Sequence, residues 1–153
     1  MNKKIPKIST KVAKEIVDIV KDFAPESYDK GLIRIQYWGS TECAYESYYH
    51  TNDKWISDDD VMLTSEEVED NPDLQDEYNR QYALWDAQND KIYKILKEID
   101  PISKGDFQFI TIVINKDNIK VNIKVGWDDN YHRYWYYKYL KDYPKFLKDY
   151  CII

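Results

Sequence analysis

The stretch from Phe107 to Ile114 constrains the fold most, because β-branched and aromatic residues occupy both of its alternating faces. This pattern is typical of a strand that is covered on both sides. After the turn-forming cluster Asn115–Asn118, apolar and polar residues alternate from Ile119 to Trp127, which predicts a second strand with one solvent-facing side. We expect this antiparallel hairpin to be central, with the rest of the chain packed around it.

The residues before position 60 indicate one helix followed by a second hairpin. Apolar residues recur at helical spacing up to Pro25, and Ser9 or Thr10 is the candidate cap of this helix. Alternation of apolar and polar residues then predicts strands. The expected strands are Gly31–Trp38, Cys43–His50 and a weaker candidate at Trp55–Ile56.

A long central helix is expected next. Asn71 and Pro72 suit the cap and the first helical position, and acidic residues follow where the helix dipole is positive. Apolar residues then recur at spacings of three, four or seven until Asp100–Pro101 stops the pattern. The stripe thins near Ala87–Asp90, so the helix is either continuous or broken there.

A C-terminal aromatic helix completes the predicted fold. It is expected from Tyr131 to Tyr139, behind a candidate cap at Asp128–Asn130. The elements together predict an α+β protein, with an antiparallel sheet of four to five strands built from hairpins and with the helices segregated to one face. The length of 153 residues and the low number of glycines and prolines favour one domain that spans residues 1–153.

Motifs that carry common chemistry are absent from the sequence. His50 and His132 are not spaced as metal ligands, and Asp58–Asp60 lacks the alternating ligands and the central glycine of a calcium loop. No serine lies in a nucleophile elbow, and neither Cys43 nor Cys151 belongs to a catalytic arrangement. We therefore expect a protein that is not an enzyme and that uses no metal or cofactor.

Hydropathy and cysteine content bear on localisation. No apolar stretch in the sequence is long enough for a membrane span or for the core of a secretion signal. Two cysteines are too few for a disulfide framework, and we expect them to stay reduced. These features predict a cytoplasmic protein with no membrane partner.

Negative charge is concentrated in one stretch. From Trp55 to Asn79 the chain carries ten acidic residues and no Lys or Arg, whereas the whole chain has a net charge of −6. One interpretation is a solvated loop and helix start whose acids favour the helix dipole. The other is a patch that steers and docks a basic protein, with neighbouring tyrosines as anchors. The candidate contact residues are Asp58, Asp59, Asp60, Glu66, Glu67, Glu69, Asp70, Tyr78 and Tyr82.

The aromatic helix offers an alternative function. Basic and aromatic residues interleave at Arg133, Trp135, Tyr137 and Lys138, and such residues stack on single-stranded bases and hold phosphates. The helical spacing of the aromatics equally suits buried packing, which we favour. Because the acidic run repels nucleic acid, we expect no nucleic-acid partner, and a single-stranded nucleic-acid-binding module is the alternative.

The chain resembles the YezG-like family of bacterial immunity proteins, which are antitoxins that neutralise secreted polymorphic toxins, many of them nucleases. The resemblance covers roughly Val12 to Leu140 and rests on the order of the elements. Its most specific part is the run Phe109–Asn118, which leads through Trp127-Asp-Asp129 to Arg133–Leu140 and ends in the pattern Trp-x-x-Lys-Tyr-Leu.

Three features depart from the family pattern: a longer N-terminal lead, a denser acidic segment from Asp58 to Asp73, and an added tail from Lys141 to Ile153. The resemblance implies a binding surface and no catalytic residues. Together with the acidic run, it predicts an antitoxin that binds a cognate toxin, a nuclease with a basic surface, and occludes its active or nucleic-acid-binding surface. The choice of contact residues comes from the charge argument alone.

Overall fold

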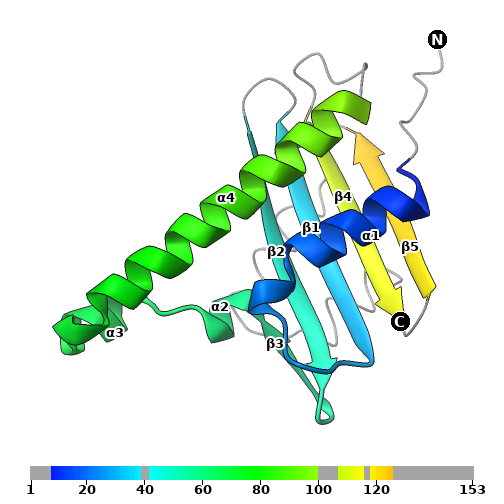
Figure 1. Cartoon of the computed structure of the whole chain (residues 1–153). Helices are drawn as coiled ribbons and strands as arrows, with labels where there is room; N and C mark the ends of the chain where they lie inside the picture. The colour runs from blue at the N-terminus through cyan, green and yellow to red at the C-terminus, as the bar shows by residue number, and fades with distance from the viewer. Residues whose placement is uncertain (1–7, 39–41, 100–106, 116–117, 126–153) are drawn as a thin grey trace.

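The computed structural model describes residues 8–38, 42–99, 107–115 and 118–125 (Figure 1). It is an α+β protein with a five-stranded antiparallel sheet in the order β3-β2-β1-β4-β5. The fold class and the strand number predicted from the sequence are therefore confirmed. The strands are β1 (Lys30–Trp38), β2 (Glu42–Thr51), β3 (Lys54–Ser57), β4 (Phe107–Asn115) and β5 (Asn118–Val125).

The middle strand of the sheet is β1, and not the strand of the Phe107 hairpin. β4 is an interior strand beside β1, and β5 lies at the end of the sheet. Every residue from Gly31 to Tyr37 is buried, although Arg34 and Gln36 interrupt the apolar pattern of β1. These two polar side chains made β1 look half-exposed in the sequence, whereas β4 carries no charged residue.

A tight turn joins β2 to β3. Asn52 and Asp53 have φ angles of 51° and 61°, which lie in the left-handed region. Positive φ at both central residues is the requirement of the two-residue turn that best matches the twist of a hairpin, and Asn and Asp tolerate it better than most residues. This turn allows the short segment Lys54–Ser57 to pair with β2, which confirms the weak strand expected at Trp55–Ile56.

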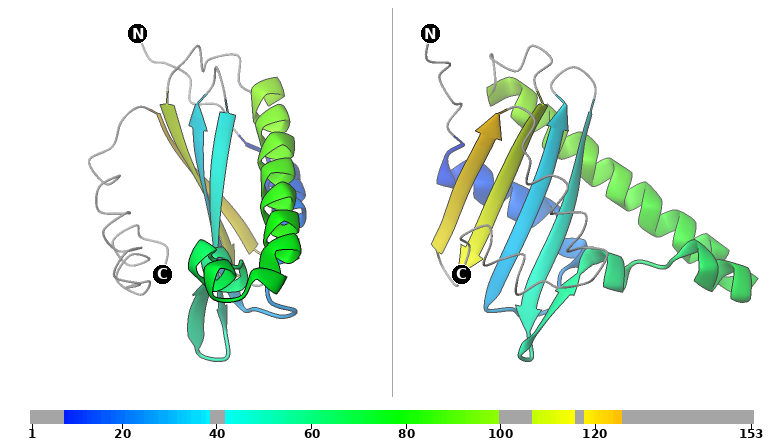
Figure 2. Two further views of the ribbon diagram at one scale, coloured as in Figure 1. Left: turned by 90° about the vertical axis from the view of Figure 1, so that its left-hand side faces the viewer. Right: turned by 180° about the vertical axis from the view of Figure 1, so that it is seen from behind.

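Two helices, α1 (Thr10–Ile19) and α4 (Gln75–Ile99), cover the same face of the sheet (Figure 2). The Ser9 hydroxyl accepts a 3.2 Å hydrogen bond from the Val12 N–H and so caps α1 as expected. Asn71 precedes the 3-10 turn η2 (Pro72–Leu74), which leads directly into α4. The 25 residues of α4 form one unbroken helix, so the thinning of its apolar stripe does not mark a break.

The acidic run contains two short helices that sequence periodicity did not predict, α2 (Asp58–Val61) and α3 (Ser65–Asp70). Neither helix is long enough to show an apolar repeat. Thr64 marks the start of α3, because its hydroxyl accepts a hydrogen bond from the Glu67 N–H. A short 3-10 turn, η1 (Lys21–Phe23), follows α1.

The described hydrophobic core lies between the sheet and the helices α1 and α4. Its buried members come from α1 and the residue that follows it, β1, β2, α4 and β4, so elements far apart in the sequence meet there. They are Ala13, Ile16, Val20, Ile33, Ile35, Tyr37, Cys43, Tyr45, Ile92, Leu96, Ile110, Ile112 and Ile114.

The aromatic helix expected at Tyr131–Tyr139 lies outside the described residues, as does His132. Of the helices that the structure does describe, none is both long and apolar enough to cross a membrane.

The pair formed by Asp29 and His50 ties the loop before β1 to β2. The two side chains meet at 2.6 Å, and the Asp29 N–H donates to the His50 carbonyl at 3.1 Å. The hydrogen bond from the His50 ring holds the pKa of Asp29 below its ordinary value. Because the pKa of Asp29 is lower in the folded protein than in the unfolded chain, the charged carboxylate stabilises the fold. This stabilisation is fully present above the unfolded pKa of about 3.9 and is lost as the pH falls through the lower folded pKa.

We therefore expect Asp29→Asn to lower the midpoint of urea unfolding at pH 5, and the difference from the unchanged protein to narrow as the pH falls to 2. Unfolding curves at several pH values measure this effect. Glu26→Gln, at an exposed position in the same loop, is the control and should follow the unchanged protein throughout. A constant difference between pH 5 and pH 2 would show that Asp29 acts by packing and not by its charge.

Candidate functional site

The acidic run builds an arm that projects beyond the sheet. We call the segment Ser65–Leu84 the arm: it comprises α3, η2 and the N-terminal part of α4. In Figure 1 this part of α4 continues past β2 into solvent, and α3 lies at its far end. α3 contacts η2, and η2 in turn contacts α4. The arm is thus a small helical hairpin, and the C-terminal half of α4 connects it to the sheet.

Few contacts hold the arm together. Val68 on α3 is buried, whereas Leu74 and Tyr78 are half-buried. The linker that leads from α2 to α3 is fixed to α4 by the Leu63 N–H, which donates to the Gln81 side chain at 2.7 Å. The arm therefore has a small core of its own, and most of its surface faces solvent.

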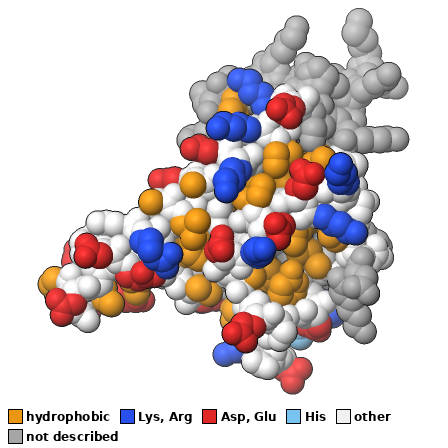
Figure 3. Space-filling model, in the orientation of Figure 1, with side chains coloured by type: hydrophobic (Ala, Val, Ile, Leu, Met, Phe, Trp, Pro, Cys, Tyr) orange, Lys and Arg blue, Asp and Glu red, His pale blue; other side chains and the backbone are white. Residues whose placement is uncertain are grey.

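Four of the predicted contact residues present their carboxylates on the arm. Glu66, Glu67, Glu69 and Asp70 are all exposed, and none of them forms a salt bridge with another described residue. We call these four residues the arm acids. In the space-filling view, acidic side chains gather at the end of the arm that lies furthest from the sheet (Figure 3).

The one basic residue of the arm does not neutralise this charge. Arg80 pairs with Glu77 on the same helix, with Nη2 and Oε1 2.5 Å apart. That bond is the main cause that lowers the pKa of Glu77. Arg80 is already paired with Glu77, so it does not offset the negative charge of the arm acids. Dissolved ions are then the main factor that screens the electric field of these acids in solvent.

The first three acids of the run are placed differently. Asp58 is only 3% exposed, so a partner protein has almost no surface of it to contact. Asp60 accepts hydrogen bonds from the N–H and the hydroxyl of Ser57 at 2.9 and 3.3 Å, and so stabilises the start of α2. The side chain of Asp59 is not described. Asp58 is thus too buried to contact a partner, whereas Asp60 is exposed and also supports the fold. Asp59 and Asp60 stay predicted contacts beside the arm.

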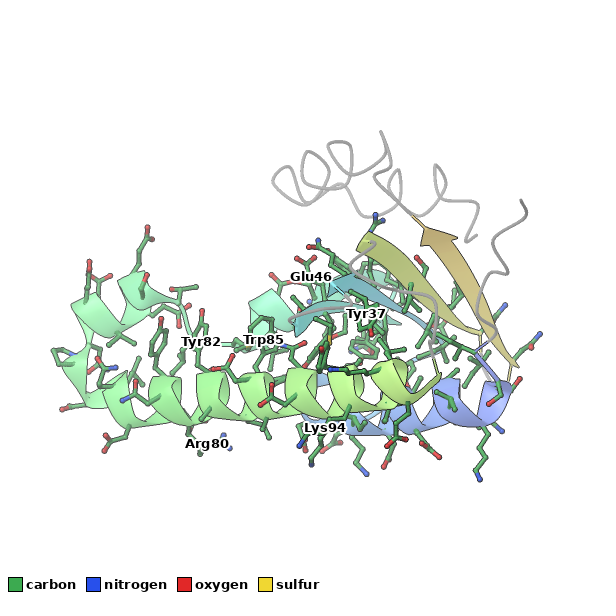
Figure 4. The ribbon with its side chains drawn as sticks, turned by 90° about the horizontal axis from the view of Figure 1, so that it is seen from above. Tyr37, Glu46, Arg80, Tyr82, Trp85 and Lys94 are labelled. Carbon is green, nitrogen blue, oxygen red and sulfur yellow. The ribbon has the colours of Figure 1, made fainter. Side chains whose placement is uncertain are left out.

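The two predicted tyrosine anchors lie on the arm and touch each other. The ring centroids of Tyr78 and Tyr82 are 4.6 Å apart, with an angle of 46° between the rings. Tyr82 is 41% exposed, and it and Val61 are the only large hydrophobic residues of the described part with such exposure. Figure 4 shows Tyr82 on the side of α4 away from Arg80. An aromatic surface therefore accompanies the arm acids.

Polar contacts that were not predicted from the sequence join α4 to β2 and η1. The Tyr45 hydroxyl donates to the Gln88 side chain at 2.5 Å, and Gln88 donates to Asp22 at 3.1 Å. The Asn89 side chain accepts a 3.0 Å hydrogen bond from the Tyr45 N–H, and the Cys43 thiol donates to the Asn89 carbonyl. Two adjacent polar residues in an apolar stripe were the available signal, and they suggested a helix break instead.

The contribution of the Tyr45–Gln88 hydrogen bond to stability can be tested by comparing Tyr45 with Tyr49. Both tyrosines are buried, but only Tyr45 donates to a side chain of α4. Burial, reinforced by the Asp58 charge, raises the pKa of Tyr45, which keeps its hydroxyl a donor. Tyr45→Phe leaves the buried Gln88 oxygen without this donor, so we expect a loss of about 1–3 kcal/mol in unfolding free energy.

Tyr49→Phe is the matched control, because the Tyr49 hydroxyl makes no hydrogen bond of normal geometry with the described residues. Its replacement should change the unfolding free energy by less than about 0.5 kcal/mol. Urea unfolding of the two variants measures both values. Equal losses would mean that the Tyr45–Gln88 bond has no special weight.

No group of three or more His, Cys, Asp or Glu side chains that could hold a metal ion is found in the described part of the chain. The residues of the alternative nucleic-acid surface, Arg133, Trp135, Tyr137 and Lys138, lie outside the described residues.

No protein-family model matches this chain, and no curated protein is significantly similar to it. Its function must therefore be inferred from the surface of the arm and from the family resemblance.

Proposed function

We propose that this chain is an immunity protein, an antitoxin that binds a cognate bacterial toxin in the cytoplasm and blocks it. The observation that carries the proposal is the arm, which holds the arm acids away from the sheet, exposed and without a salt bridge to any described residue. The family resemblance supplies the class of partner. In this proposal the arm covers the active or nucleic-acid-binding surface of a nuclease toxin, and the aromatic helix at Tyr131–Tyr139 stays a prediction.

Charge complementarity supports a partner of this class. A nuclease must attract phosphates, so its functional surface carries Lys and Arg. An inhibitor with clustered carboxylates is drawn to the same surface, and complementary fields raise association rates steeply at low salt. A projecting arm also reaches into a concave surface that a flat sheet could not enter.

The placement of Glu69 and Asp70 favours a binding function over a structural one. Acids at the start of a helix interact favourably with the helix dipole, and this accounts for Glu66 and Glu67. Glu69 and Asp70, however, end α3, where the dipole is negative, and the last turn of this helix contains no basic residue. Their charge is unfavourable for the helix, as expected where function and stability compete.

The tyrosines of the arm provide candidate anchors. Tyr78 and Tyr82 present adjacent ring surfaces on the part of α4 that belongs to the arm. Aromatic residues are frequent among the side chains that dominate binding energy, and their faces attract Lys and Arg. The arm thus offers carboxylates and aromatic faces together, and both suit an Arg-rich partner.

A pull-down followed by an inhibition assay tests the proposal. The tagged protein is used to capture partners from the source cell at low and high salt, and the retained protein is then purified and tested for nuclease activity. We expect one basic protein whose nuclease activity is abolished by an equimolar amount of this chain. A retained protein that stays active in the complex would contradict the proposal.

A gel-shift titration at low salt addresses the alternative. Single-stranded RNA or DNA should not be shifted by an antitoxin whose arm is acidic. A clear shift that salt reverses would instead support the nucleic-acid-binding module and would count against an immunity function.

A further inference from the structure

We infer that Gln88 and Asn89 are positioning residues that set the direction of the arm relative to the sheet. The functional meaning of this inference rests on the proposed function, because the direction of the arm matters only if the arm meets a partner. Its structural basis is independent of any partner. We call the contacts that Gln88 and Asn89 make with β2 and η1 the polar latch.

The latch lies where α4 leaves the sheet. Towards the C-terminus of α4, the apolar residues Ile92 and Leu96 are buried in the core between α4 and the sheet. Towards the N-terminus, the helix continues into the arm, where the structure shows no strand beneath it (Figure 4). Gln88 and Asn89 are the last fully buried residues of α4 before the arm.

Adjacent residues on a helix point about 100° apart at 3.6 residues per turn, so Gln88 and Asn89 reach different elements. Gln88 links the Tyr45 hydroxyl to Asp22 in η1. Asn89 binds the main chain of β2 through the Tyr45 N–H and receives the Cys43 thiol. These attachments diverge from the helix axis, and they restrict both its rotation and its sliding.

Apolar packing alone does not supply this restriction. Ile92 and Leu96 are buried, and Trp85 and Tyr93 pack against the same core. Burial of apolar area is non-directional, so this packing restricts sliding and tilting of the helix less sharply than polar contacts do. Hydrogen bonds require defined distances and angles. Leaving a buried donor or acceptor unpaired is costly, so alternative directions of α4 are disfavoured.

The bond to Tyr45 also completes the edge of β2. β3 pairs only with Tyr48–Thr51, so the earlier part of β2 has no strand on its outer side in the described sheet. The Asn89 side chain takes the place of a strand for the Tyr45 N–H. A free strand edge is open to unwanted pairing, and the latch covers this one while it orients the helix.

The length of the lever makes the direction sensitive to the latch. Gln75, the first residue of α4, lies about 21 Å from Asn89 along the axis, at roughly 1.5 Å per residue. If α4 tilts by about 10° about the latch, the far end of the arm therefore moves by about 4 Å. Such a displacement is larger than the length of a hydrogen bond, so the arm acids would be misplaced on a rigid partner.

Distance measurements between two spin labels test the inference. Labels are attached through a keto amino acid incorporated at Gln75 and at Lys14, which are exposed positions on α4 and α1, so both native cysteines stay intact. The unchanged protein should give one narrow distance distribution. Asn89→Ala should give a broader or divided distribution, and hydrogen exchange at the Tyr45 amide should accelerate by about tenfold or more.

Ile92→Val is the matched control, because it weakens the same helix–sheet interface without removing a hydrogen bond. Its distance distribution should stay narrow. If Asn89→Ala does not fold, Gln88→Met removes the other half of the latch and should broaden the distribution in the same way. A distribution for the folded latch variant as narrow as that of Ile92→Val would overturn the inference.

No toxin is present in this measurement, so its outcome is separate from that of the proposed function. A broad distribution together with an absent partner would retain the latch and refute the antitoxin. A narrow distribution together with an inhibited nuclease would retain the antitoxin and refute the latch.

Discussion

Replacement of Ile35 by alanine is expected to lower the free energy of unfolding by about 2–5 kcal/mol. Ile35 is fully buried in the middle strand β1, where it pairs with Tyr45 of β2 on one side and Ile110 of β4 on the other. Truncation removes apolar contacts and leaves a cavity beneath the helices, and close-packed neighbours refill such a cavity only in part. Urea unfolding at 25 °C measures the loss.

Val61→Ala provides the control for Ile35→Ala. Val61 is 44% exposed at the end of α2, so the same kind of truncation should change stability by less than about 0.5 kcal/mol. If Ile35→Ala costs less than about 1 kcal/mol, the packing around β1 is looser than the structure indicates. The comparison separates loss of the core from loss of apolar side chain in general.

Reversing the charge of Glu69 and Asp70 to lysine is expected to slow association with the captured toxin by roughly ten- to a hundredfold at low salt, because the steering field is lost. The same change should leave thermal stability equal or slightly higher, since Lys suits the C-terminal end of α3. Stopped-flow or surface-based association rates at several salt concentrations, together with thermal melts, measure both effects.

Asp86→Lys with Asp90→Lys is the matched control, because it makes the same change in charge at two exposed positions of α4 outside the arm. A much smaller effect on association is expected there. If both pairs slow association equally, net charge and not the arm attracts the toxin. If neither pair does, the toxin is contacted elsewhere, although the chain could still be an antitoxin.

Local chemistry explains which elements were predictable. The cap at Ser9 and the start at Asn71–Pro72 each depend on side chains next to the backbone they serve. The position of β1 in the middle of the sheet does not. It depends on partners far away in the chain, and the polar side chains Arg34 and Gln36 concealed the burial of this strand.

The acidic run that forms the candidate site is visible in the sequence, but the structural roles of its members, Asp58, Asp60 and the arm acids, are not. Asp58 is set apart by its burial, and Asp60 by the hydrogen bonds that it accepts from Ser57. The latch at Gln88 and Asn89 was hidden for a similar reason, since its partners lie on β2 and η1.

During translation, the two neighbours of β1 leave the ribosome at very different times. β2 follows β1 almost at once, whereas β4 pairs with β1 through residues as distant as Lys30 and Asn115. At ~5–20 residues per second, the chain between them takes roughly 4 to 15 s to synthesise. During that interval one edge of β1, the strand that contains Ile33 and Ile35, has no partner strand. Nascent chains of this protein are therefore expected to depend on chaperones that bind exposed apolar segments.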